Sequence, residues 1–293
     1  QCLKFLNIVD TFIKDRVSLL EYKATCLAQL NRNADAKKIY HDLLNINSEN
    51  HDYLKQYQLT SGLPQDSTSE EQTTQIVELY DSLAKEYPDS AAIKRIPLNY
   101  LSGEGFRKRV SEYVKPFLTQ NVPSLFSNLK ALYTDSEKVQ IIEEVFLSYA
   151  NTLEKSNKYP DAEETEAPTT YLWTLLYLAF HYDKLGQLQT ALETINKAIK
   201  HTPTAIELYM AKARILKHSG AYQEAANAMD IARKMDLADR YLNTKATKYL
   251  LRADRTEEAA DILYLFAKDQ EQKFNIADMQ GSNFEISSGD SFL

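Results

Sequence analysis

The fold of this chain is indicated by residues 172–203, which read LWTLLYLAFHYDKLGQLQTALETINKAIKHTP. Apolar residues recur at helical spacing on both sides of Gly186, and the small residues Ala179 and Ala191 fall where two helices would cross closely. Pro203 follows the second run, at the point where a helix has to end. This is the pattern of a tetratricopeptide repeat, a pair of antiparallel helices.

The same pattern returns twice at intervals of 34 residues. The turn position holds Gly186, Gly220 and Asp254, and the crossing position holds Ala191, Ala225 and Ala259. Chance rarely places a small residue at three equivalent crossings. We therefore predict three well-formed tetratricopeptide repeats in residues 171–278.

The rest of the chain fits the pattern more loosely. Residues 1–157 predict degenerate helical hairpins, with turns at Asn31, around Gly103 and Gly105, and around Asp135. Polar, turn-rich stretches interrupt the chain at 61–75 and 158–170, the second being acidic, and 279–293 begins a further, truncated helix. A single repeat cannot bury its own apolar face, so the predicted fold is an all-α tetratricopeptide-repeat α-solenoid, a right-handed superhelix of helical hairpins.

Composition agrees with this class. The 293 residues include 7 glycines and 8 prolines, where average usage near 7% would give roughly 20 glycines. A sandwich, barrel or doubly wound sheet needs more glycine-bearing turns, and 44% apolar residues exclude a disordered chain. The first residue is Gln1 and no signal peptide follows, so we expect an internal piece of a longer chain.

Charge and cysteine content limit the partners. A net charge of −7 argues against wholesale coating of nucleic acid, although a local basic patch can exist within that average, and no specific nucleic acid is expected as a partner. The sequence has no apolar run long enough to span a membrane. Cys2 and Cys26 have no framework spacing, so they are expected to be reduced thiols of a cytoplasmic protein.

No catalytic or metal site is predicted. The five histidines lack metal-ligand spacing, and no glycine-rich loop opens a helix as a nucleotide cradle. His181, Tyr182 and Asp183 resemble a triad, but consecutive helical residues point in different directions. Tandem helical repeats of this kind usually bind other molecules.

A basic groove is predicted on the last two repeats. The positions of each first helix that point away from its core carry Arg214, Lys217 and His218 in one copy and Lys245, Lys248 and Arg252 in the next. Residues 201–255 contain 10 basic and 6 acidic residues, a net +4 within a chain of −7. Such a surface fits a polyphosphate or an acidic partner, or it is a solvated charged face. The pattern leaves these alternatives open.

The aromatic residues divide into two groups. Tyr40, Tyr80 and Tyr182 occupy core positions of the repeat. Trp173 and Phe180 occupy groove positions, where they could anchor a partner or pack against the preceding hairpin.

Several short sequence segments resemble the auxiliary subunit of N-terminal acetyltransferase A, and the resemblance covers essentially the whole chain. They are Pro168-Thr-Thr-Tyr-Leu-Trp173, His181-Tyr-Asp-Lys-Leu-Gly-Gln187, Thr202-Pro-Thr-Ala-Ile-Glu-Leu208, Lys217-His218, Ala238-Asp239-Arg240-Tyr-Leu-Asn243, Leu98-Asn-Tyr-Leu-Ser-Gly103 and Met279-Gln280. Members of this family are much longer, so the resemblance is to a middle portion.

The resemblance implies a non-catalytic scaffold that wraps the catalytic acetyltransferase subunit and ties it to ribosomes, through regions mostly outside this chain. It implies no required cofactor, and inositol hexakisphosphate as a ligand in some members. The residues that match its binding positions are Arg214, Lys217, Lys245 and Lys248, with Tyr249, Arg240 and His218. The alternative is a generic repeat adaptor that recruits peptides to a multiprotein assembly.

Overall fold

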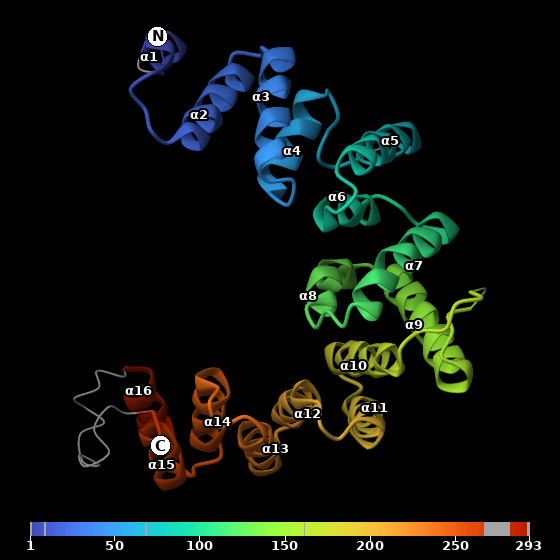
Figure 1. Cartoon of the computed structure of the whole chain (residues 1–293), viewed down its shortest axis with the longest axis vertical. Coiled ribbons are helices and arrows are strands. Elements are labelled where there is room, and N and C mark those ends of the chain that lie inside the picture. The colour runs from blue at the N-terminus through green and yellow to red at the C-terminus, as the bar shows by residue number, and fades with distance from the viewer. Residues whose placement is uncertain (1, 9, 68, 161, 267–281, 292–293) are drawn as a thin grey trace. The chain divides into compact units, whose positions relative to one another are not determined.

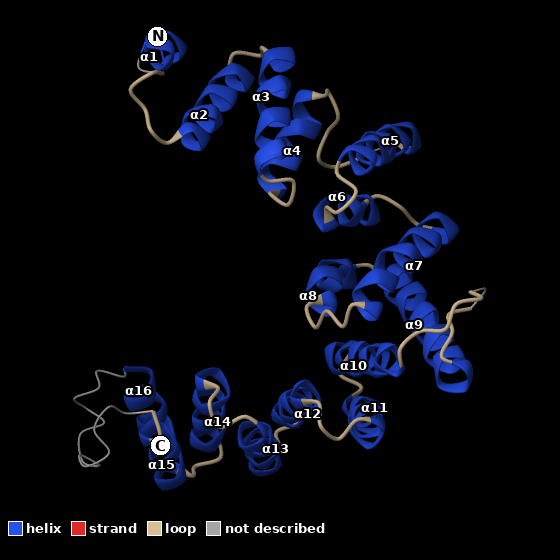
Figure 2. Cartoon of the chain, viewed as in Figure 1, coloured by secondary structure: helices blue, strands red, loops and turns tan. Residues whose placement is uncertain are grey.

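The structure is a computed structural model that describes residues 2–8, 10–67, 69–160, 162–266 and 282–291. Within these ranges every regular element is helical, which confirms the predicted all-α class (Figure 1, Figure 2). The chain divides into two compact units, Gln1–Tyr113 with Ala131–Ile141, and Val114–Lys130 with Ile142–Leu293.

The first unit begins with six α-helices and a short 3-10 helix. These are α1 (Cys2–Ile8), α2 (Arg16–Gln29), α3 (Asn33–Ile46), α4 (His51–Thr60), α5 (Glu70–Glu86), α6 (Ala91–Arg95) and η1 (Ile96–Asn99). The chain turns between α2 and α3 at Asn31, as predicted, with a left-handed φ of 56°. The predicted polar insertion at 61–75 contains the loop before α5 and the first turns of that helix.

A carboxylate joins neighbouring elements of the first unit. Glu49, in the turn between α3 and α4, accepts hydrogen bonds from the backbone N–H groups of Ala91 and Ala92, at 2.8 and 3.0 Å. These N–H groups open α6 and have no partner within their own helix. Tyr80, only 1% exposed, donates to Gln58 Oε1 at 3.0 Å and so links α5 to α4.

Two α-helices contribute to both units, α7 (Gly103–Thr119) and α9 (Ser136–Ser156). Asp135 precedes α9 and accepts from the N–H groups of Glu137 and Lys138, so the chain does turn at this residue. The predicted turn around Gly103 and Gly105 is wrong in part. Gly103 has a left-handed φ of 53° but already begins α7, and Gly105 lies inside the first turn of that helix.

The second unit contains the remaining elements. These are α8 (Leu125–Leu129), η2 (Lys130–Thr134), which begins in it, α10 (Pro168–Lys184), α11 (Leu188–His201), α12 (Ile206–His218), α13 (Tyr222–Met235), α14 (Arg240–Arg252), α15 (Thr256–Tyr264) and α16 (Ser282–Ser291). Three hairpins, α10–α11, α12–α13 and α14–α15, occupy the region predicted to hold three repeats. Its final residues, 267–278, lie outside the described ranges.

The repeat register is confirmed at the turns and at the crossings. Gly186, Gly220 and Asp254 all adopt left-handed backbone conformations, with φ of 74°, 80° and 55°. The alanines at the helix crossings, Ala179, Ala191, Ala213, Ala225 and Ala259, are fully buried. The tyrosines predicted for the core, Tyr40, Tyr80 and Tyr182, are buried as well. None of the helices in the described part of the chain combines the length and apolarity that crossing a membrane requires.

Gly220→Ala tests the requirement for a left-handed turn. A Cβ at Gly220 would meet no atom within 4 Å, so the substitution costs only backbone strain. We expect the free energy of unfolding to fall by about 1–2 kcal/mol, measured by urea denaturation. Gly105→Ala is the matched control, because Gly105 has an ordinary helical conformation and its added Cβ would make a normal 3.6 Å contact. An equal loss in both variants would contradict the turn assignment.

Candidate functional site

A groove of about 270 Å³ opens between the first helices of the three C-terminal repeats. Its apolar part is lined by Pro123, Leu176, Phe180, Met210, Ala211 and Met229. Its polar part is lined by Glu207, Arg214, Tyr241, Lys245 and Tyr249. The polar residues lie on α12 and α14, where Tyr241, Lys245 and Tyr249 follow one another at helical spacing on one face of α14.

A buried carboxylate on α10 contacts an arginine and a histidine side chain of the next repeat. The Asp183 side chain is only 1% exposed, and its Oδ1 lies 2.6 Å from Nδ1 of His218. Its Oδ2 lies 3.3 Å from Nε of Arg214. Burying a carboxylate is costly unless opposite charges and hydrogen-bond donors surround it. Asp183 therefore ties α10 to α12 beside the groove.

Arg214 is held on a second side by an aromatic ring. Its guanidinium lies over the ring of Phe180, 5.0 Å from the centroid, and Phe180 packs on Phe126 of α8 at 5.6 Å. Phe180 therefore contacts the preceding hairpin, one of the two alternatives that the sequence left open, and it also lines the groove. Trp173 is half-buried on the same helix. The role of both residues in partner binding stays a prediction.

The basic residues form one cluster, which we call the cation cluster and define as Arg214, Lys217, His218, Lys245 and Arg252. Burial lowers the pKa of the Lys217 ammonium, and the positive charges of Arg252 and Arg214 lower it further. Lys245 has a smaller effect in the same direction, and Asp183 opposes these effects. The cluster thus contains mutually repelling charges held on rigid helices.

Aromatic side chains of α14 lie among these charges. The Lys245 ammonium lies 5.3 Å from the centroid of the Tyr241 ring. Burial raises the pKa of the Tyr249 hydroxyl, while Arg252 and Arg214 act in the opposite direction, which places Tyr249 beside these two cations. An anion in the groove would meet guanidinium, ammonium and hydroxyl donors from two helices.

The structure brings together most of the residues predicted from the sequence. Arg214, Lys245 and Tyr249 line the groove. His218 contacts the same carboxylate, Asp183, as Arg214 does, and Lys217 is close enough to Arg214 and Arg252 for their charges to lower its pKa. Lys248 is exposed one turn after Lys245, at the edge of the same face of α14. Arg240 differs, because its guanidinium lies over the Phe266 ring at 5.6 Å, about 100° around the helix from Tyr241. Its assignment to the cluster is therefore not supported by the placement of its side chain.

The sequence reasoning missed the role of Asp183. The 34-residue register places Asp183 one repeat before Lys217, at the equivalent groove position, so the signal was present. A buried acid among groove cations becomes evident only when neighbouring helices are seen together. The same register also places Ala211 and Leu251 at groove positions. Ala211 does line the groove, although it is only 2% exposed, whereas Leu251 packs in the core with Ala226 and Ala259.

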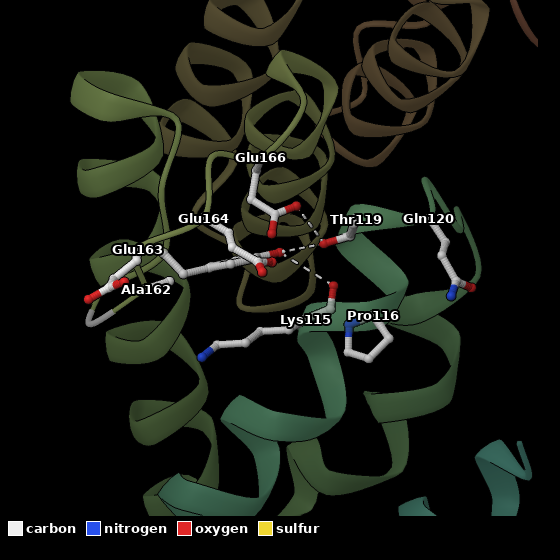
Figure 3. A pocket seen from close by; sticks show the side chains of 9 residues that line it. Lys115, Pro116, Thr119, Gln120, Ala162, Glu163, Glu164 and Glu166 are labelled. Atoms are coloured by element: carbon white, nitrogen blue, oxygen red, sulfur yellow. Dashed lines mark hydrogen bonds between the residues drawn. The ribbon is translucent and has the colours of Figure 1, made fainter. Parts of the chain in front are cut away.

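A second, larger pocket of about 600 Å³ lies under the acidic stretch predicted as an insertion. Figure 3 shows Glu163, Glu164 and Glu166 gathered near Lys115 and Thr119 of α7. Thr119 Oγ1 donates to Glu166 Oε2 at 2.9 Å. The Tyr159 hydroxyl donates to the Lys115 carbonyl at 3.3 Å. These bonds fasten Tyr159 and Glu166 to α7, and α10 begins shortly after Glu166, at Pro168.

Metal ligands do not gather anywhere in the described ranges: no three His, Cys, Asp or Glu side chains lie close enough together to hold an ion. Cys26 is half-buried.

Comparison with known proteins assigns the family. Residues 1–293 match the model of the N-terminal acetyltransferase A auxiliary subunit. The chain belongs to this family. Among curated members of the auxiliary-subunit family, it is 40% identical over 295 residues to "N-terminal acetyltransferase A complex auxiliary subunit NAA15" of Arabidopsis thaliana, a match covering 100% of this chain and 33% of that protein. It is 36% identical over 288 residues to "N-alpha-acetyltransferase 16, NatA auxiliary subunit" of Mus musculus, covering 97% and 32%.

A solved structure of this auxiliary-subunit family shares the fold. The structure of Naa15/Naa10 bound to HypK-THB matches with a TM-score of 0.87 at 35% identity, covering 99% of this chain and 43% of that chain. The family resemblance expected from the sequence is thus confirmed. The chain spans about a third of the length of the curated auxiliary subunits that it matches.

Proposed function

We propose that this chain is part of a non-catalytic scaffold that wraps and positions the catalytic subunit of a co-translational N-terminal acetyltransferase. Family membership supports this role, because the family is that of an auxiliary subunit. The structurally similar Naa15 is bound to Naa10, which supports a heterodimer. Stacked helical hairpins also suit the role, because they present extended surfaces for binding.

We further propose that the groove binds a polyphosphate such as inositol hexakisphosphate. The observation that carries this proposal is the cation cluster, in which Arg252 and Arg214 lower the pKa of Lys217. A multivalent anion between these groups would replace their repulsion with charge-assisted hydrogen bonds, which are among the strongest in proteins. The proposed scaffold is cytoplasmic, and it associates with ribosomes through regions mostly outside this chain, as the family role implies.

A titration tests the polyphosphate site. Inositol hexakisphosphate should raise the melting temperature of the wild-type chain, and Lys217→Glu should abolish most of the increase, since it places a carboxylate among the cations. Lys200→Glu makes the same charge change at an exposed position of α11 and should leave the increase intact. Lys248→Glu should have a smaller effect than Lys217→Glu, because Lys248 is exposed at the edge. No increase in the wild type would exclude a polyphosphate site and favour acidic partner residues or a solvated face.

Co-purification separates the scaffold from a generic repeat adaptor. The full-length chain should co-purify with a stoichiometric acetyltransferase subunit, and it should show no measurable acetyl-CoA turnover without that subunit. Recovery of diverse peptide ligands without an acetyltransferase would instead favour the adaptor. Turnover by the isolated chain would overturn the non-catalytic role.

A further inference from the structure

Asp183 occupies an unusual place in the proposed polyphosphate site. A carboxylate lowers the affinity of a groove for anions by simple Coulomb repulsion, yet Asp183 lies within contact of two members of the cation cluster. Its side chain is almost completely buried, whereas the Arg214 and His218 side chains are 37% and 38% exposed. Asp183 therefore lies behind the cations, and they separate it from solvent.

The contact with Asp183 determines which part of Arg214 can meet a ligand. The Nε atom lies beside Oδ2 of Asp183, and one face of the guanidinium lies on Phe180. The two Nη groups are the donors that remain for an anion. Phe180 and Asp183 are three residues apart on α10, so a single helix provides both supports.

The contact with Asp183 also determines the tautomer of His218. An ionised carboxylate only accepts hydrogen bonds, so the proton at the 2.6 Å contact belongs to Nδ1 of the imidazole. A neutral His218 then has a lone pair at Nε2, which repels a phosphate oxygen. A protonated His218 has a donor at Nε2 and carries a positive charge.

We propose that Asp183 is a positioning residue of the polyphosphate site: it orients Arg214 and His218 toward the anion and makes anion binding require a proton on His218. This inference rests on the proposed polyphosphate function. The charged groups around the site are Asp183 on α10, Arg214, Lys217 and Glu207 on α12, and Lys245 and Arg252 on α14. These groups are carboxylates, lysines and arginines, none of which ordinarily changes its charge between pH 5 and 8, whereas a histidine side chain ordinarily does.

The first test compares two losses of negative charge. The dissociation constant of inositol hexakisphosphate is measured for the full-length chain in complex with its catalytic subunit. Asp183→Ala should weaken binding about tenfold, as expected for losing a charge-assisted contact, although a negative charge has been removed. Glu207→Gln is the matched control, because Glu207 also lines the groove but is exposed. It should leave the affinity unchanged or increase it.

The second test is the pH dependence. Inositol hexakisphosphate itself titrates near neutral pH, so the informative quantity is the affinity ratio of wild type to His218→Asn at each pH. If binding takes up one proton on His218, this ratio should fall as the pH is raised, by up to about tenfold per pH unit. Asp183→Asn keeps an acceptor oxygen but permits either tautomer. It should bind more tightly than Asp183→Ala, with a flatter pH profile than the wild type.

The outcomes distinguish this inference from the proposed function. If the wild type binds while Asp183→Ala binds equally or more tightly, the positioning role is overturned and the polyphosphate site stands. A ratio of wild type to His218→Asn that does not change with pH also overturns it. If the wild type does not bind at all, both proposals fail. Melting temperature without ligand and recovery of the catalytic subunit serve as folding controls, and Asp183→Asn decides the outcome if Asp183→Ala unfolds.

Discussion

Phe146→Ala is expected to lower the free energy of unfolding by about 3–5 kcal/mol. Phe146 is fully buried in α9, and its ring stacks on Tyr177 of α10 with 3.7 Å between centroids and 6° between planes. Its removal takes away apolar contact between consecutive repeats and leaves a cavity that rigid helices cannot close. Urea denaturation measures the loss, and hydrogen exchange of α9 and α10 should show that it is local to their interface.

Phe12→Ala is the control for this substitution. Phe12 is 81% exposed, so the same change of side chain should alter the free energy of unfolding by less than about 0.5 kcal/mol. A small effect of Phe146→Ala, or a large effect of Phe12→Ala, would contradict the packing between α9 and α10.

The double substitution Lys217→Glu with Lys245→Glu is expected to eliminate polyphosphate binding. Each change removes a charge-assisted contact and adds a like charge beside the anion. Together they should lower the affinity for inositol hexakisphosphate by about 100-fold to 10,000-fold. Isothermal titration of the complex with the catalytic subunit measures this change, and the wild-type affinity should also fall steeply with added salt.

Lys200→Glu combined with Lys234→Glu is the matched control. Both lysines lie on second helices of their repeats, α11 and α13, and outside the residues that line the groove. The control has the same net charge as the double variant, so equal losses of affinity would show that total charge, and not the cation cluster, governs binding.

The fold could be predicted because local rules decide it. Gly220 and Asp254 recur at a position that needs a left-handed backbone, and Ala213 and Ala225 recur where helices cross. A repeat contacts mainly its neighbours, so each copy predicts the next one. The turn around Gly103 was predicted less well, since glycine is also tolerated in the first turn of a helix, where α7 holds Gly105.

The site could be predicted only in part, because it depends on directions of side chains across helices. The register placed Arg214 and Lys217 on one face, and the structure gathers them. It could not show that Arg240 extends toward Phe266 or that Asp183 is buried behind Arg214. Both facts depend on how α10, α12 and α14 pack together.

The contact of Asp183 with Arg214 and His218 has a consequence for how such a site can change in evolution. The carboxylate belongs to the first of three repeats, two cations to the second, and Lys245 to the third. No repeat contains the site by itself. Deleting the hairpin α12–α13 would remove the partners of Asp183, and duplicating it would separate the copy of α12 that contacts Asp183 from Lys245 on α14. The proposed ligand would therefore constrain the number of repeats in this region, whereas a stack of hairpins by itself can gain or lose repeats.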